Sequence, residues 1–314
     1  MTVAVVDIGT NTALLLVASV EDTGWITPLV SEQRIPRLGR GVDASATLLA
    51  DSMDRAIGVL QEYRDLLQHY QPASVVVCGT SALRDASNRE EFAARVMAAT
   101  GYVLEILSGE EEALWTFAGA LSGLRGQFSG TVVDIGGGST EVSWGEAGRL
   151  SGHASIDVGA VRLSERFLRH DPPAPEEIEQ ARVWLRAELN DHLRPAREIS
   201  PLIGVAGTAT TLALLDQGLQ TFSVDAIVNY RLSRRSVDQL LNRLCTLSHE
   251  EIRRLADALH GREDIIVAGT LILHEVMELL GASELVVSER GIRYGLVRRE
   301  WARLEGRELG LRAP

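Results

Sequence analysis

Two short segments of this sequence place an aspartate directly before a turn of glycines and hydroxyl or amide residues. Their polar and glycine positions are Asp7, Thr10, Asn11 and Thr12 in the first segment, and Asp134, Gly136, Gly137, Gly138 and Ser139 in the second. The backbone N–H groups and hydroxyls of such turns bind phosphate oxygens, and an aspartate at a strand end can hold a divalent cation. Two such turns facing each other would form a phosphate clamp.

The two segments are copies of one pattern. Val5–Gly9 and Val132–Gly136 are identical, and an apolar strand pattern resumes after each turn. Ordinary hairpins would explain a single copy, because Gly and Asn are common in turns, but two matching copies favour a shared function. A dinucleotide-binding loop needs a helix after its glycines, whereas Thr140–Trp144 alternates like a strand. A P-loop is excluded, since the chain contains no lysine.

Three consecutive glutamates, Glu110 to Glu112, begin a predicted helix. Carboxylates at a helix N-terminus stabilise it by roughly a few tenths of a kcal/mol each, and Glu111 has capping-box spacing from Ser108. At about 100° per residue the three side chains cannot point the same way. Glu112 lies on a smaller and more polar helix face, so we expect Glu112 to be the general base if one of the three fills that role.

Two further positions follow buried strand patterns. Arg84 comes just after the turn Gly79-Thr80-Ser81, where a phosphate role is more common than for a surface arginine. Gly207-Thr208 stands between a strand and a helix, which suits an anion at a helix N-terminus or simply a tight turn. His170-Asp171 has no companion histidines at metal-ligand spacing, so we interpret it as a turn. Because no G-x-S-x-G nucleophile occurs, water is the simplest nucleophile.

Strands alternate with helices along the chain. Apolar patterns predict strands at 3–8, 13–20, 75–78, 103–107, 131–144 (a hairpin), 202–206 and 284–287, and helices at 47–69, 88–99, 108–121, 176–194, 236–244, 249–259 and 264–280. This alternation, with its duplicated hairpin, predicts an α/β fold of two similar domains. We place the domains at 1–124 and 125–298, with a hinge at Gly123–Gly130, and expect a closing helix at 299–314 that packs on the first domain.

Composition narrows the class of protein. The 314 residues suffice for two cores, and a net charge of −12 argues against a general nucleic-acid binder. Cys78 and Cys245 lack the spacing of a metal site or a disulfide framework, which fits a reducing compartment. No basic leader precedes the first strand, and no apolar run reaches membrane-spanning length. We therefore expect a soluble cytoplasmic protein.

An ordered set of motifs runs through nearly the whole chain. The motifs are Asp7–Thr12, Arg37–Gly39, Gly79–Arg84, Ser108–Ala113, Asp134–Glu141, Gly159–Leu163 and Gly207–Thr208. The set resembles the exopolyphosphatase/guanosine pentaphosphate phosphohydrolase (Ppx/GppA phosphatase) family of the actin-like ATPase superfamily, in its short two-domain form. This resemblance implies an α/β fold of two actin-like (ribonuclease H-like) domains with the active site in the cleft between them.

The resemblance also implies a role for individual residues. The family's catalytic glutamate falls on Glu112, in agreement with the choice made from helix geometry. Asp134 and Glu141 match the acids that hold the attacking water and a divalent metal, Mg²⁺ or Mn²⁺, and Asp7 is a further candidate metal ligand. The phosphate-binding residues would be Thr10, Asn11, Thr12, Arg84, Gly136, Gly137, Gly138, Ser139, Gly207 and Thr208.

The implied activity is metal-dependent hydrolysis of the terminal phosphoanhydride of inorganic polyphosphate, processive or distributive, with release of orthophosphate. The longer members carry a C-terminal helical extension that this chain lacks, which favours short polyphosphate. Guanosine pentaphosphate is the alternative substrate, since the same site could remove its 5′ phosphate. A sugar or acid kinase finds no support, whereas a non-catalytic polyphosphate or nucleotide sensor stays open. We expect no nucleic-acid or membrane partner, with a homodimer as one option for assembly.

Overall fold

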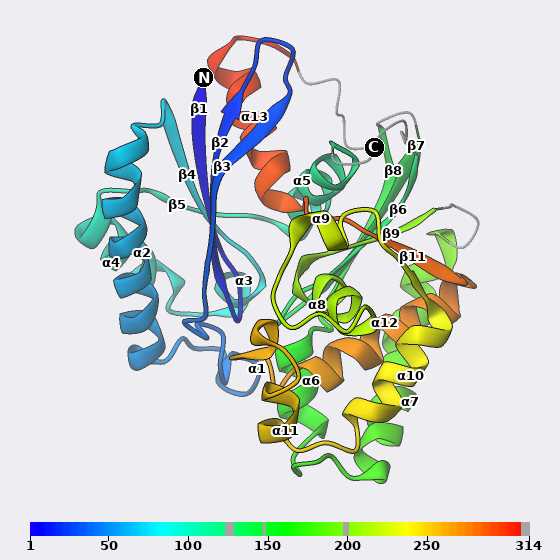
Figure 1. Cartoon of the computed structure of the whole chain (residues 1–314). Helices are drawn as coiled ribbons and strands as arrows, with labels where there is room; N and C mark the ends of the chain where they lie inside the picture. The colour runs from blue at the N-terminus through cyan, green and yellow to red at the C-terminus, as the bar shows by residue number, and fades with distance from the viewer. Residues whose placement is uncertain (123–128, 147–148, 197–200, 309–314) are drawn as a thin grey trace. The chain divides into compact units, whose positions relative to one another are not determined.

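The chain forms two compact units, each built around its own sheet. A computed structural model describes residues 1–122, 129–146, 149–196 and 201–308 (Figure 1). Of these, Met1–Gly119 and the residues from Ile292 onward belong to the first unit, and Ala120–Gly291 forms the second. The domain limits expected at 124 and 298 stay predictions, and the hinge expected at Gly123–Gly130 lies mostly outside the described residues.

The first unit contains a five-stranded sheet. In spatial order its strands are β3 (Ile26–Arg34), β2 (Ala13–Val20), β1 (Thr2–Ile8), β4 (Ser74–Gly79) and β5 (Leu104–Ile106). β1, β2 and β3 form an antiparallel meander, and β4 and β5 continue parallel to β1. Its helices are α1 (Val42–Ser45), α2 (Ala50–Tyr70), α3 (Ser81–Asp85), α4 (Arg89–Thr100), α5 (Gly109–Ser122), whose last residues enter the second unit, and α13 (Ile292–Leu304).

The second unit contains a six-stranded sheet. In spatial order its strands are β10 (Arg231–Ser233), β11 (Glu284–Val287), β9 (Leu202–Val205), β6 (Gly130–Ile135), β7 (Thr140–Glu146) and β8 (Arg149–Ile156). Its helices are α6 (Ala160–Phe167), α7 (Pro175–Leu193), α8 (Ala206–Asp216), α9 (Val224–Ile227), α10 (Arg234–Leu244), α11 (His249–Arg253) and α12 (Ile266–Leu280), with short 3₁₀ turns η1 (Arg194–Ala196) and η2 (Asp257–Leu259).

The repeat predicted from the sequence is present in the backbone. Each unit opens with an antiparallel meander, β1-β2-β3 or β6-β7-β8, and adds a parallel strand beside the first one, β4 or β9. The glycine turns close with the same hydrogen bond, from Gly9 N–H to the Thr12 carbonyl at 2.8 Å and from Gly136 N–H to the Ser139 carbonyl at 3.0 Å. The prediction of an α/β chain with two similar halves is therefore confirmed.

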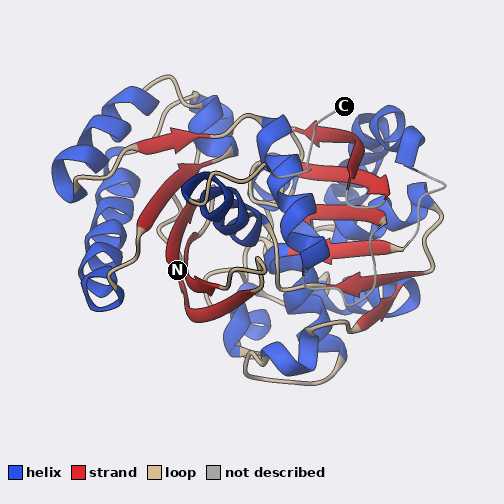
Figure 2. Cartoon of the chain, turned by 90° about the horizontal axis from the view of Figure 1, so that it is seen from above, coloured by secondary structure: helices blue, strands red, loops and turns tan. Residues whose placement is uncertain are grey.

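Side-chain alternation along β1 explains how the first sheet is covered on both faces. Ala4, Val6 and Ile8 pack with α2 and α4, whereas Val3 and Val5 face α13 on the other side. Figure 2 shows helices lying on both sides of the strands. Asp7 has the parity of Val3 and Val5, so its carboxylate points to the α13 face. In the second unit, α7, α8, α10 and α12 contribute to one large apolar core.

The last helix begins earlier than the sequence suggested. α13 starts at Ile292 rather than 299, and its buried Leu296 and Trp301 pack on the first sheet. Residues 309–314 of the expected helix lie outside the described residues. None of the helices within the described ranges is long and apolar enough to cross a membrane.

Candidate active site

The first glycine turn is held in place by the segment that follows β3. The Arg37 amide donates to the Asn11 carbonyl at 3.0 Å, and the Gly39 amide donates to the Thr10 carbonyl at 2.8 Å. A Cβ on Gly39 would lie 2.3 Å from Thr10 Cγ2, so glycine is required for this close approach. Thr10 and Asn11 are buried and Thr12 is half-buried. The Arg37–Gly39 motif, whose role the sequence left open, thus positions the predicted phosphate turn.

Asp7 lies at the end of β1, directly before this turn, and its carboxylate is incompletely satisfied. Oδ1 is buried and has no hydrogen-bond partner in the part of the chain that the structure describes. Burial raises the pKa of Asp7 from 3.8 to about 7; the negative charge of Glu112 adds to this rise and Arg293 opposes it. An unsatisfied buried carboxylate oxygen calls for water or a cation, so Asp7 fits the predicted role of metal ligand.

The three glutamates at the start of α5 lie in three different environments. Glu111 caps the helix: its carboxylate accepts from the Ser108 amide at 2.9 Å, and the Ser108 hydroxyl accepts from the Glu111 amide at 3.2 Å. The predicted capping box is therefore confirmed. Glu110 is exposed, whereas Glu112 is only 8% exposed. Of the three carboxylates, only that of Glu112 is buried.

Glu112 forms an ion pair with Arg84 of α3. Arg84 Nη1 donates to Glu112 Oε2 at 2.5 Å and to the Leu107 carbonyl at 3.2 Å. Burial raises the pKa of Glu112 above its ordinary value, and the charge and hydrogen bond of Arg84 partly oppose that rise. In the first unit the structure thus pairs Glu112 with Arg84 and brings Glu112 within electrostatic range of Asp7. Arg84, predicted to grip phosphate, here holds the carboxylate of the predicted base.

The second glycine turn is held by the N-terminus of α6. The Ala160 and Val161 amides donate to the Gly136 and Gly137 carbonyls at 2.9 and 2.8 Å. A Cβ on Gly159 would lie only 2.4 Å from the Gly137 carbonyl, so any other residue would displace the turn.

Side chains complete this support of the second turn. Arg162 Nε donates to the Gly138 carbonyl at 2.8 Å, and Ser139 is buried. The Gly159–Leu163 motif is therefore the counterpart of Arg37–Gly39: in each unit a downstream segment binds the carbonyls of the turn and fixes its shape.

Asp134 and Glu141 lie opposite each other in the β6–β7 pair. Directly paired residues have Cβ atoms about 5 Å apart, so their carboxylates share one face of the sheet. Glu141 is buried and accepts from the Ser155 hydroxyl at 2.9 Å. Described residues contain no cluster of three or more His, Cys, Asp or Glu side chains able to hold a metal. Mg²⁺, however, is commonly held by one or two carboxylates with water and phosphate, so this pair fits such an ion.

Gly207 and Thr208 lie in the first turn of α8, directly after β9, as predicted. Thr208 is buried, and a Cβ on Gly207 would lie 1.7 Å from Arg262 Nη1. The Arg262 guanidinium therefore lies against the backbone at the start of α8, and burial lowers its pKa to about 10. An arginine beside a helix N-terminus is a favourable environment for an anion.

The comparisons with known proteins show the family of the chain. The sequence model of the Ppx/GppA phosphatase family matches residues 16–304. The chain belongs to the Ppx/GppA phosphatase family. Exopolyphosphatase 2 of Mycobacterium tuberculosis is 35% identical over 308 residues, covering 94% of this chain and 97% of that protein.

Solved structures of Ppx/GppA proteins agree with this assignment. The family member from Aquifex aeolicus has a TM-score of 0.82 at 29% identity, covering 98% of this chain and 99% of that one. An exopolyphosphatase from Cytophaga hutchinsonii has a TM-score of 0.86 at 26% identity, with 98% and 99% coverage. The predicted resemblance to this family is thus confirmed, and the fold is α/β with two similar units, as that resemblance implied.

Two arginines beside the predicted phosphate-binding segments were not among the predicted site residues. Arg162 of α6 donates to the second turn, and Arg262, which follows η2, lies against the start of α8. Arg162 carried a signal, because it stands in the Gly159–Leu163 motif. Arg262 could not be recognised from the sequence, because it is distant from Gly207 along the chain and belongs to none of the seven motifs.

Proposed function

We propose that this chain is an exopolyphosphatase, which hydrolyses the terminal phosphoanhydride of inorganic polyphosphate and releases orthophosphate. The observation that carries the proposal is the buried Glu112, held by Arg84 in the same unit as the first glycine turn. The names of the two exopolyphosphatases above support polyphosphate as the substrate.

Glu112 is suited to act on water. A buried carboxylate with a raised pKa is a stronger base than an exposed one, and a general base typically contributes about 10²- to 10⁴-fold to the rate. Arg84 fixes the direction of the carboxylate, because its guanidinium donates both to Glu112 and to the backbone at Leu107. The proton taken from water would reside on Glu112 until phosphate leaves.

The two glycine turns would bind the phosphate oxygens. Their carbonyl groups are already bonded to the segments at 37–39 and 159–162, so the turns keep one shape before substrate arrives. Such preorganisation lowers the cost of orienting the reacting phosphate.

The residues present fit a divalent cation, Mg²⁺ or Mn²⁺. Asp134 and Glu141 would hold it in the second unit, and Asp7 offers an unsatisfied carboxylate oxygen in the first. When bound, the ion would offset the negative charge that develops on the transferred phosphoryl group.

Guanosine pentaphosphate is the second candidate substrate. Arg262 at the start of α8 supplies a further cationic group that could bind an additional phosphate of such a ligand. A nucleotide or polyphosphate sensor would bind the same ligands without releasing orthophosphate.

Orthophosphate release with Mg²⁺ tests the proposal. The purified protein is assayed with short polyphosphate, long polyphosphate, guanosine pentaphosphate and ATP, each with and without EDTA. We expect release from polyphosphate that EDTA abolishes, and the two chain lengths give the length preference. Orthophosphate release from guanosine pentaphosphate alone would show that this nucleotide, and not polyphosphate, is the substrate. Binding of polyphosphate without any release would favour the sensor.

A further inference from the structure

The backbones of α5 and α13 approach each other unusually closely at one point. A Cβ built on Gly295 of α13 would lie 1.9 Å from the carbonyl oxygen of Trp115 in α5, and 2.7 and 2.9 Å from its carbonyl carbon and Cα. All three atoms belong to the backbone, so no side-chain rotation can make room. The position therefore requires glycine, and Trp115 lies one helical turn after Glu112.

A second contact lies one turn further along the same face of α13. The Arg299 guanidinium lies 5.8 Å from the centre of the Trp115 ring, within the range of a cation–π interaction. Its two terminal nitrogens donate to the two carboxylate oxygens of Glu105 on β5, both at 2.7 Å. Gly295 and Arg299 thus contact the backbone and the ring of one α5 residue.

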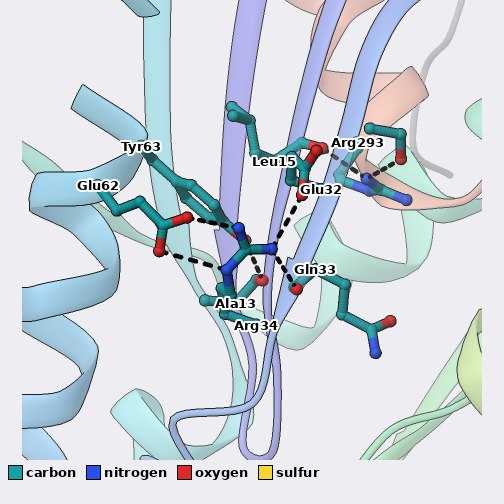
Figure 3. Close-up of polar contacts among 9 residues, drawn as sticks. Ala13, Leu15, Glu32, Gln33, Arg34, Glu62, Tyr63 and Arg293 are labelled. Carbon is teal, nitrogen blue, oxygen red and sulfur yellow. Dashed lines mark hydrogen bonds and ion pairs between the residues drawn. The ribbon is translucent and has the colours of Figure 1, made fainter. Parts of the chain in front are cut away.

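α13 is itself anchored across the first sheet. Figure 3 shows Arg293 reaching β2, where Nη1 donates to the Leu15 carbonyl at 2.9 Å, beside the cluster in which Arg34 binds Glu32 and Glu62. At the other end of α13, Glu300 accepts from the Ser74 hydroxyl at 2.6 Å, at the start of β4. Because α13 is fixed to the sheet, its contact with Trp115 fixes α5 to the sheet as well.

We infer that Gly295 is a positioning residue for catalysis: by letting α13 touch the α5 backbone at Trp115, it sets where the Glu112 carboxylate lies against Arg84. The inference rests on the proposed role of Glu112 as general base. It gives the C-terminal helix a part in the chemistry through its contact with α5.

Gly295→Ala tests the inference. The added methyl forces α13 and α5 apart by more than about 1 Å, and a displacement of that size can cost about 10²-fold in rate. We expect kcat to fall about 10- to 100-fold with KM changed less than about 3-fold, because the glycine turns are not touched. Separating Glu112 from Arg84 removes the influence that lowers its pKa, so the acidic limb of the pH–kcat profile should move to higher pH.

Gly58→Ala is the matched control. Gly58 also lies within a helix, α2. Apart from its chain neighbours and the backbone of its own helix, no described atom lies within 4 Å of a Cβ built there, so alanine should leave kcat and the pH profile unchanged. If Gly295→Ala does not fold, Arg299→Lys takes its place. Lysine keeps the charge but cannot form the fork to Glu105, so a smaller change in the same direction is expected.

Hydrogen exchange of the α5 amides provides a readout independent of activity. We expect faster exchange across 110–119 in Gly295→Ala than in the wild type or in Gly58→Ala. A folded Gly295→Ala protein with unchanged kcat, pH limb and exchange would overturn the inference. If the wild type releases no phosphate from any substrate, the proposed function fails, while the exchange comparison still decides whether Gly295 positions α5.

Discussion

In the ion pair of Glu112 and Arg84, the arginine lowers the pKa of the carboxylate. Arg84→Gln removes the charge and the hydrogen bond that lower the pKa of Glu112, while burial, which raises it, remains. Glu112 must be ionised to accept a proton, so activity is lost as pH falls through its pKa. We therefore expect the acidic limb of kcat/KM to move to higher pH in Arg84→Gln, measured from pH 5 to 9.

Arg254→Gln provides the control for that profile. Arg254 forms an exposed ion pair with Glu250 of α11 in the second unit, and its replacement should leave the acidic limb at the pH found in the wild type. A limb that stays unmoved in Arg84→Gln as well would show that Arg84 does not tune Glu112.

Asp7 is expected to make folding stability depend on pH. Its pKa of about 7 in the folded protein exceeds the unfolded value of 3.8, so the folded state binds more protons between these values. Stability therefore falls as pH rises through this window. Without metal at pH 8, Asp7→Asn should be more stable than the wild type by about 2–4 kcal/mol in urea unfolding, and the difference should vanish below about pH 4.

Added Mg²⁺ should narrow that difference in stability if Asp7 holds the ion. The wild type would gain about 2.7 kcal/mol at a Mg²⁺ concentration 100 times the dissociation constant, and Asp7→Asn would gain less. Equal stabilisation of both proteins would remove Asp7 from the metal site. Asp51→Asn, an exposed carboxylate on α2, serves as the control for general salt effects.

At the scale of elements, the conformation of the second glycine turn requires that residue 159 has no side chain. Gly159→Ala places a methyl 2.4 Å from the Gly137 carbonyl and must displace the turn, because the contact is with backbone. We expect KM for polyphosphate to rise and kcat/KM to fall about 10-fold or more. Steady-state kinetics with Gly58→Ala as the helix control measure this, and unchanged kinetics would show that the turn does not bind phosphate.

The elements that carry the site were the most predictable ones. The hairpins at β1–β2 and β6–β7 were predicted from a five-residue segment that occurs identically in both and from the regular alternation of apolar residues. β3 and β8 were missed: β3 is an edge strand with one fully buried residue, Ile26, and β8 is rich in small and polar residues. Neither strand has a continuous apolar face, and such strands are set by pairing with their neighbours rather than by their own sequence.

Residue positions were predictable only in part. The capping role of Glu111 followed from its spacing from Ser108. The choice of Glu112 among the three glutamates followed from helix geometry, and its role as base stays a prediction. The segments that hold the two turns, 37–39 and 159–162, were recognised as motifs, but their role was not predicted, because the sequence does not show which carbonyl a backbone amide will bind. For Arg262 neither a motif nor a role was recognised, since its contact with Gly207 depends on tertiary packing alone.

At the scale of the whole molecule, the first unit is discontinuous in sequence. The chain leaves the first unit within α5 and returns to it at Ile292. The side chains of α13 therefore share one apolar core with those of β1. The sequence predicted a closing helix on the first domain but only from 299, because the helical pattern at 292–297 carries no information on which sheet it covers.

A chain ending at Gly291 should therefore lose the first unit. Its missing buried side chains, Ile292, Tyr294, Leu296, Val297 and Trp301, each contribute about 1.5–3 kcal/mol, together about 10 kcal/mol, which is comparable with the stability of a whole domain. We expect the truncated chain to show no protected amides in β1 and β4 by hydrogen exchange. Native-like protection there would mean that α13 is dispensable for the fold.

The central claim, that Glu112 is the base for phosphoanhydride hydrolysis, is tested most directly by comparing three neighbouring substitutions. Glu110→Gln, Glu111→Gln and Glu112→Gln are assayed for orthophosphate release from polyphosphate with Mg²⁺, after circular dichroism has shown that each is folded. We expect Glu112→Gln to lose about 10²- to 10⁴-fold in kcat, while the exposed Glu110 and the capping Glu111 tolerate the change within a few-fold. Equal activity of all three variants and the wild type would refute a catalytic role for Glu112.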